Sequence, residues 1–203
     1  AIYSLLLSLN YGFCRPGDTA QLQRRVSACV DDVGSLMQSN RLQLNTAKTE
    51  VLWCTSARRQ HQIPDDSLMV GLDVVQPVRS VRDLGIYLDS DLSMRTHVTR
   101  IVSSCFAVQR QIRSIRRSVS RSVVQSLIVS LVLSRLDNGG STLAGLPARL
   151  LERLQSVLNA AARLVYGSRK YDHVMPLLHD LHWLRVPERI TFRLAVLAYR
   201  CQH

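Results

Sequence analysis

The sequence predicts a mixed α+β protein, in which a small unit of one helix and short antiparallel strands is followed by an all-helical unit. In residues 1–92, short apolar stretches rich in Val, Leu and Trp alternate with polar turns, which is the pattern of strands. In residues 93–203, apolar residues recur every three to four positions, which is the period of amphipathic helices. We therefore expect the two units to meet between residues 92 and 93.

Length and composition narrow the class of protein. The 203 residues, 46% hydrophobic and 20% charged, suffice for one or two packed domains and exclude a disordered or collagen-like chain. The five cysteines are too few and too unevenly spaced for a disulfide framework or a zinc site, which favours a reducing compartment. No apolar run approaches the roughly 20 residues of a membrane-spanning helix, so we expect a soluble protein with no membrane partner.

The first unit is predicted to hold one helix and three strands. The turn at Pro16-Gly17, followed by Asp18 as a helix cap, predicts a helix that ends near Ser39. Strands are predicted at residues 48–55, 68–75 and 81–88, and Gly85 is expected to break the last of them.

The second unit is predicted to be helical throughout. Helices are expected at residues 94–117, 118–137, 147–165 and 174–181, and from residue 187 onward. Pro147 suits the first turn of its helix. Because residues 118–137 carry no charge between Arg121 and Arg135, we expect this helix to be buried on most of its sides.

The excess of positive over negative charge is confined to the second unit. Residues 1–93 carry a net charge of −1 and residues 94–203 a net charge of +12, which together give the overall +11. Such an imbalance predicts a polyanionic partner such as nucleic acid or an anionic membrane surface. Of the 26 cations, 24 are arginine; its planar guanidinium suits phosphate oxygens, although a GC-rich genome would produce the same bias.

The strongest functional signal is a row of arginines on the helix predicted at 94–117. Arg95, Arg110, Arg113 and Arg117 fall on one side of it and the apolar residues on the other. Such a row can follow a phosphate backbone, although an ordinary solvated helix face would look the same. Aromatic residues make up only 5% of the chain, so contacts to a duplex backbone fit better than stacking on single-stranded bases.

The candidate metal-binding and catalytic groups do not form a set. Asp31 and Asp32 would lie about 100° apart on a helix instead of facing one metal pair. Asp89 and Asp91 suit the start of the helix that follows them. The histidines near residue 180 lack a cysteine or carboxylate cluster, and no cysteine has a His/Asn partner set. We therefore expect no metal site and no thiol nucleophile.

Six sequence blocks occur in order along the chain. They are Leu42–Glu50, Asp83–Asp89, Ser134–Asp137, Gly145–Pro147, Asn159–Leu164 and Leu181–Val186. Together they resemble LINE-type (non-LTR) retrotransposon reverse transcriptases. The resemblance implies that residues 1–92 are the C-terminal part of a polymerase palm with primer-grip-like strands. It also implies that residues 93–203 are the arginine-rich thumb and the helices after it.

The resemblance also implies roles for single residues. Lys48 would match the motif D lysine, which assists as a proton donor to the pyrophosphate leaving group. Leu84 and Gly85 would match the turn of the primer grip, which holds the primer end. The four arginines of the row would contact phosphates of an RNA:DNA template–primer duplex from its minor-groove side.

One departure from the family bears on catalysis. The family carries a Tyr-Ala-Asp-Asp box directly before the segment that begins here at Tyr11, where this chain has IYSLLLSLN at residues 2–10. Two-metal phosphoryl transfer needs clustered carboxylates, so the sequence predicts a reverse-transcriptase fragment that binds template–primer but is inactive alone. Mg²⁺ is expected for the complete family enzyme, and neither a metal nor a small-molecule cofactor for this chain.

Two other interpretations fit the same residues: a helical scaffold module that binds RNA or protein, and a decayed element with no selected role. Apolar strands at the palm edge would also permit self-association. The family implies a nuclear or cytoplasmic ribonucleoprotein location.

Overall fold

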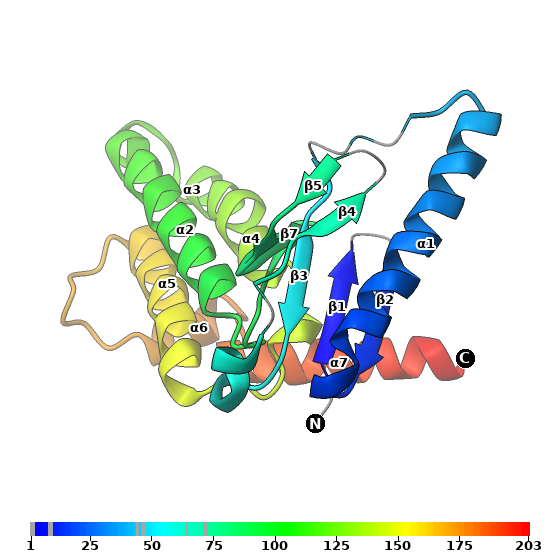
Figure 1. Ribbon diagram of the computed structural model, residues 1–203. Coiled ribbons are helices and arrows are strands. Elements are labelled where there is room, and N and C mark those ends of the chain that lie inside the picture. Colours follow the sequence, from blue (N-terminus) through cyan, green and yellow to red (C-terminus); the bar gives the residue numbers. More distant parts are fainter. Residues whose placement is uncertain (1–2, 8–9, 44, 46–47, 64, 71–72) are drawn as a thin grey trace. The chain divides into compact units, whose positions relative to one another are not determined.

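The chain folds into two compact units, Ala1–Ser93 and Met94–His203. The computed structural model describes residues 3–7, 10–43, 45, 48–63, 65–70 and 73–203. The first unit combines a helix with short strands and the second is mostly helical (Figure 1), which confirms the predicted α+β class.

The first unit is built on a small sheet and two hairpins. Its elements are β1 (Tyr3–Leu7), β2 (Asn10–Cys14), the 3₁₀ turn η1 (Pro16–Asp18), α1 (Thr19–Ser39), β3 (Val51–Cys54), the 3₁₀ helix η3 (Ala57–Gln62), β4 (Leu68–Val70), β5 (Asp73–Val75), β6 (Pro77–Val78), β7 (Ser80–Asp83) and β8 (Ile86–Asp89). The sheet has the order β2-β1-β3-β6, with β6 parallel to β3 and the other pairs antiparallel.

The segment predicted as a single strand at 68–75 contains an antiparallel pair, β4 and β5. That prediction was wrong because a short apolar run has the same composition whether or not the chain reverses within it. The break predicted at Gly85 in the segment 81–88 is confirmed, since β7 and β8 pair antiparallel on either side of Leu84 and Gly85. The strand predicted at 48–55 is confirmed in its second half, since β3 begins at Val51.

Strand β3 is buried on both faces. Val51 and Trp53 pack with Leu22 of α1 in one cluster, whereas the alternate residues Leu52 and Cys54 pack in another. Successive side chains of a strand point to opposite faces, so burial of both faces explains why this strand is continuously apolar. β3 thereby holds the first unit together.

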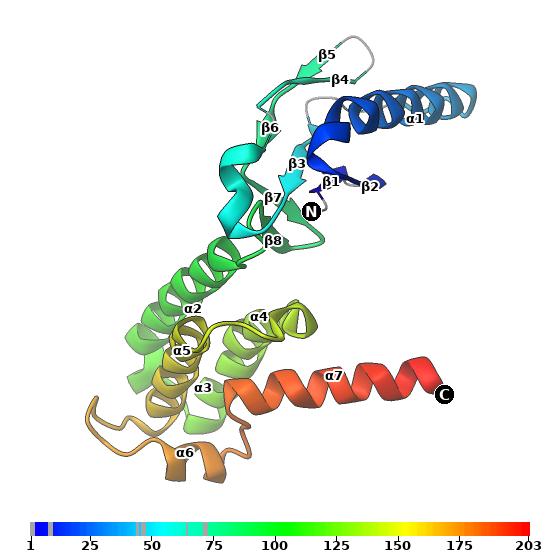
Figure 2. The same ribbon diagram turned by 60° about the horizontal axis from the view of Figure 1, so that its bottom comes forward.

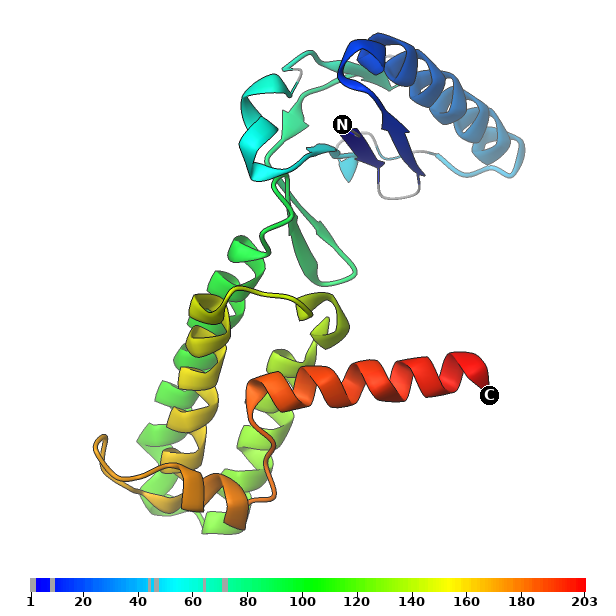
Figure 3. The same cartoon turned by 90° about the horizontal axis from the view of Figure 1, so that it is seen from below.

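The second unit is a set of packed helices. It contains α2 (Arg95–Ile115), the 3₁₀ turn η4 (Arg116–Ser118), α3 (Arg121–Ile128), the π-helical turn η5 (Val129–Leu133), α4 (Ser134–Asp137), the 3₁₀ turn η6 (Gly140–Leu143), α5 (Ala148–Tyr166), α6 (Met175–Asp180) and α7 (Val186–Gln202). Helices α2 and α5 lie side by side in every view (Figures 2 and 3). No helix among the described residues is long and apolar enough to cross a membrane.

One buried polar side chain, Gln109, lies in the contact between α2 and α5 and has a hydrogen-bond partner there. Gln109 is 3% exposed, and its side-chain amide donates a hydrogen bond of 3.0 Å to the main-chain oxygen of Val157. Ala161 is fully buried, and its small side chain permits a close helix approach. The hydrogen bond fixes the position of α2 along α5 because an unpaired buried amide would be unfavourable.

Residues 118–137 are less buried than the sequence predicted. Val124 and Ile128 are buried, but Val123, Val129 and Leu131 are 44, 44 and 40% exposed. The serine hydroxyls of this segment form hydrogen bonds with the main chain of their own helix. Ser130, for example, donates to the main-chain oxygen of Ser126 at 2.8 Å. An uncharged helix can therefore keep a solvent-facing side, and the expectation of burial on most sides was wrong.

Candidate nucleic-acid interface

The predicted row of arginines divides into two groups in the structure. Arg110, Arg113 and Arg117 are exposed near the C-terminal end of α2. None of them forms a hydrogen bond or ion pair with any residue that the structure describes. Arg95 begins the helix and makes contacts of its own. Since a helix rises about 1.5 Å per residue, Arg95 lies roughly 22 Å from Arg110 along the axis.

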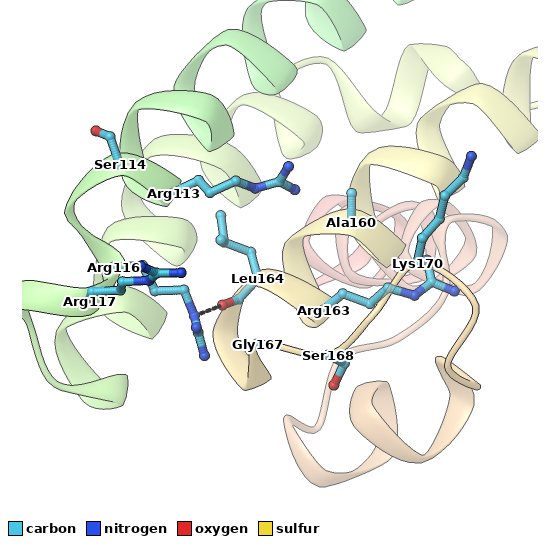
Figure 4. Close-up of a pocket in the computed structure, with 10 residues that line it drawn as sticks. All are labelled: Arg113, Ser114, Arg116, Arg117, Ala160, Arg163, Leu164, Gly167, Ser168 and Lys170. Carbon is cyan, nitrogen blue, oxygen red and sulfur yellow. Dashed lines mark hydrogen bonds between the residues drawn. The ribbon is translucent and has the colours of Figure 1, made fainter.

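A pocket of about 630 Å³ lies beside this group, between the C-terminal ends of α2 and α5 (Figure 4). Five cations line it: Arg113, Arg116, Arg117, Arg163 and Lys170. The other lining residues are small or apolar: Ser114, Ala160, Leu164, Gly167 and Ser168. Neither a carboxylate nor an aromatic ring lines this pocket. We call it the cationic pocket.

Arg116 is fixed against the end of α5. Its Nε donates a hydrogen bond of 2.8 Å to the main-chain oxygen of Leu164, where the last carbonyls of the helix favour a cation. Gly167 ends α5 in the left-handed conformation, with φ +72°. A Cβ atom at Gly167 would overlap the Arg116 guanidinium, so glycine is needed here both for the backbone and for the arginine.

Among the described residues, no carboxylate forms an ion pair with the remaining pocket cations. Arg163 donates from Nη2 to the main-chain oxygen of Asp172 at 3.1 Å, while the Asp172 carboxylate accepts from the main-chain N–H of Arg169. The ammonium of Lys170 lies 5.8 Å from the ring centre of Tyr171. Carbonyl and ring contacts leave the formal charge intact, so the pocket stays strongly positive.

Two acidic residues of the helical unit, Asp137 and Asp180, pair with arginines outside the cationic pocket. Asp137 pairs with Arg189 at 2.6 Å and with Arg193 at 3.0 Å. Asp180 pairs with Arg121 at 3.2 Å and accepts a hydrogen bond from Tyr166. The hydrogen bond from Tyr166 is the main cause that lowers the pKa of Asp180, and the hydrogen bond from Arg121 lowers it further. The unit thus separates paired arginines, which hold its helices together, from the unpaired ones at the cationic pocket.

The predicted primer-grip turn is the tip of the β7–β8 hairpin. Leu84 and Gly85 connect the paired residues Asp83 and Ile86, with φ values of +45° and +87°. Two successive positive φ values are typical of a type I′ hairpin turn. The Leu84 side chain is 92% exposed and contributes nothing to the core. Its positive φ is also unfavourable for a leucine.

Lys48, the predicted motif D lysine, lies on the first unit and lines neither the cationic pocket nor the β7–β8 turn. It is exposed, and its main-chain N–H donates to the oxygen of Asn45 at 3.0 Å. Its predicted place at the start of a strand was wrong, because it lies in a helical turn three positions before β3. Its side chain has no hydrogen-bonding partner among the residues that are described.

The described residues contain no cluster suited to a metal ion, and two of the five cysteines are buried. No group of three or more His, Cys, Asp or Glu residues within the described ranges is arranged to hold a metal ion. Burial raises the pKa of Cys54 and of Cys105 to about 11, so both stay protonated at neutral pH. A protonated thiol is a poor nucleophile.

Three members of the cationic pocket were not among the predicted site residues: Arg116, Arg163 and Lys170. Arg116 and Arg163 are 47 positions apart, so no periodic pattern joins them. A weaker signal was present in the sequence, since both helix ends carry arginine and the second also carries a C-capping glycine.

No protein-family model, curated protein or solved structure matches the chain.

Proposed function

We propose that the chain binds the phosphate backbone of nucleic acid through the exposed arginines at the end of α2 and the adjacent cationic pocket. The observation that carries this proposal is five cations around one pocket that no carboxylate lines. Arginine and lysine that face solvent without an acidic partner attract phosphates strongly, because binding releases the counterions of the nucleic acid.

The resemblance to LINE-type reverse transcriptases gives the proposal a specific form. In that form the helical unit is the thumb, and its ligand is an RNA:DNA template–primer duplex. Arg110, Arg113 and Arg117 hold phosphates of the duplex. Three cations on neighbouring helical turns fix the register of a backbone and read no bases, which suits a polymerase that copies any sequence.

The β7–β8 hairpin supports the same proposal. An exposed leucine at a strained hairpin tip has no structural use inside the first unit, and strained residues cluster at functional sites. In the proposal, Leu84 and Gly85 contact the primer end, and Lys48 is the motif D lysine. Mg²⁺ belongs to the complete family enzyme, and we assign no phosphoryl-transfer step to the residues described here. A nuclear or cytoplasmic ribonucleoprotein location follows from the family.

Fluorescence-anisotropy titration with a labelled RNA:DNA hybrid tests the proposal. We expect the hybrid to bind more tightly than DNA duplex or single-stranded RNA. The double variant Arg113→Gln/Arg117→Gln should bind it about tenfold more weakly, since a charge-assisted hydrogen bond contributes roughly 1 kcal/mol or more. Arg149→Gln/Arg200→Gln is the matched control, because it removes the same charge from exposed positions of the helical unit that do not line the pocket.

Indifference to every nucleic acid would overturn the proposal and favour the protein-binding scaffold. Equal weakening by the Arg113/Arg117 double variant and by Arg149→Gln/Arg200→Gln would show that overall charge is responsible, not this site. Binding of RNA with no preference for the hybrid would reject the template–primer form.

A further inference from the structure

The cationic pocket concentrates more charge than a single backbone phosphate can balance. We propose that it binds a multiply charged phosphate group, of the kind found at the phosphorylated end of a nucleic-acid strand or in a free oligophosphate. The strand-end form rests on the proposed function, whereas the oligophosphate form does not. Both go beyond it, because backbone binding requires only singly charged phosphodiesters.

The charge of the pocket favours such a ligand. Its five cations have no carboxylate among them. A phosphodiester brings one negative charge, while a terminal phosphate brings about −1.5 to −2 at neutral pH. A ligand with one charge would leave most of these cations repelling one another, so affinity should rise with the charge density of the phosphate group.

Two of the cations are already held in place. The hydrogen bond of Arg116 to Leu164 uses only its Nε, and Figure 4 shows this bond at the wall of the pocket. The main-chain oxygen of Asp172 similarly holds Arg163. A guanidinium carries five N–H donors, so each of these arginines keeps donors for a ligand. Groups fixed before binding lose less entropy when a ligand arrives.

The remaining pocket cations can adapt to the ligand. Arg113 and Arg117 form no hydrogen bond with any described residue, and Lys170 is exposed on the segment after α5. Arginine can offer a phosphate two parallel donors and lysine a mobile point charge. Fixed and mobile cations together can surround several phosphate oxygens.

The size and lining of the pocket indicate that bases are not read. A volume of about 630 Å³ exceeds one phosphate and lies within the usual range for small-molecule sites. Its apolar lining is limited to Ala160 and Leu164, with no ring on which a base could stack. Binding should therefore depend on the phosphate group and be the same for different bases.

Two measurements on the full chain test the inference. The first compares, at constant salt, the affinities of two labelled oligonucleotides that differ only in carrying a 5′-phosphate or a 5′-hydroxyl. The second is calorimetric titration with tripolyphosphate, with sulfate at equal ionic strength as the control anion. We expect the 5′-phosphate to bind at least about fivefold more tightly, or tripolyphosphate to bind with saturation where sulfate does not.

Variants assign the effect to the pocket. Arg163→Gln/Lys170→Gln should abolish the preference, and Lys170→Gln alone should reduce it without disturbing packing, because Lys170 is exposed. Arg149→Gln, at the other end of α5, should leave it unchanged.

The outcomes separate this inference from the proposed function. Equal binding of both oligonucleotides, with no saturable heat from tripolyphosphate, overturns the inference and leaves backbone binding standing. Saturable tripolyphosphate binding without any oligonucleotide binding supports a free oligophosphate as the ligand and rejects the proposed function. An equal effect of Arg149→Gln overturns the inference, since charge at any position would then suffice.

Discussion

At the scale of single residues, the absence of a Cβ atom at Gly167 leaves room for the Arg116 guanidinium of the cationic pocket at the end of α5. Its φ of +72° lies in the left-handed region, and a Cβ atom would displace the Arg116 guanidinium. Gly145 has a similar φ of +76° but open space around the Cβ position. The two glycines therefore share the backbone requirement, and only Gly167 has the close arginine.

Alanine substitution at these two glycines should separate backbone strain from pocket geometry. We expect Gly145→Ala and Gly167→Ala each to lower the free energy of unfolding by about 1 kcal/mol, because alanine is disfavoured at positive φ. Only Gly167→Ala should also weaken tripolyphosphate binding, since Arg116 must move. Urea unfolding and calorimetry measure the two effects. If both variants bind tripolyphosphate like the wild type, Arg116 does not contribute to the pocket.

At the scale of elements, Asp137 joins α7 to the preceding helices through two arginines. Arg189 donates to the two carboxylate oxygens of Asp137 at 3.1 and 2.6 Å, and both side chains are about one-fifth exposed. Arg193 pairs with the same carboxylate and also donates to the main-chain oxygen of Asp137 at 2.7 Å. Beyond Ile190 the residues of α7 are largely exposed, so the contacts at its first turns hold the helix.

Removing the Asp137 carboxylate should therefore loosen α7. We expect Asp137→Ala to lower the free energy of unfolding by about 2 kcal/mol, because it leaves the half-buried Arg189 without its partner. Arg193→Ala should have a smaller effect, under about 1 kcal/mol, since its side chain is 46% exposed. Hydrogen exchange should show faster exchange in α7 for Asp137→Ala. Unchanged exchange would mean that packing of Val186 and Ile190 suffices.

Periodicity located the long helices better than the strands. The predictions of helices ending near Ser39 and spanning 147–165 are confirmed by α1 and α5 within about one residue, because an amphipathic face repeats many times over such lengths. The hairpin at 68–75 was missed because three-residue strands leave no room for a repeated pattern. The cationic pocket was found only in part, since α2 and α5 supply its residues from distant parts of the sequence.

At the scale of the whole molecule, charge is distributed unevenly over the chain. Residues 94–203 carry a net charge of +12, whereas residues 1–93 are nearly neutral. Within the helical unit, ion pairs with Asp137 and Asp180 neutralise arginines that join helices. The unpaired cations at the end of α2 and in the pocket should therefore dominate attraction to a polyanion, not the overall +11.

The salt dependence of nucleic-acid binding distinguishes local from overall charge. Each neutralised phosphate contributes about 0.9 to the slope of log K against log salt concentration. We expect the triple variant Arg110→Gln/Arg113→Gln/Arg117→Gln to lower the slope by about 2 to 3, because in the proposed complex each of these arginines contacts one phosphate. The matched control is Arg24→Gln/Arg25→Gln/Arg58→Gln, which removes the same charge from exposed positions of the first unit. Its slope should equal that of the wild type, and equal losses in both variants would mean that net charge alone attracts the nucleic acid.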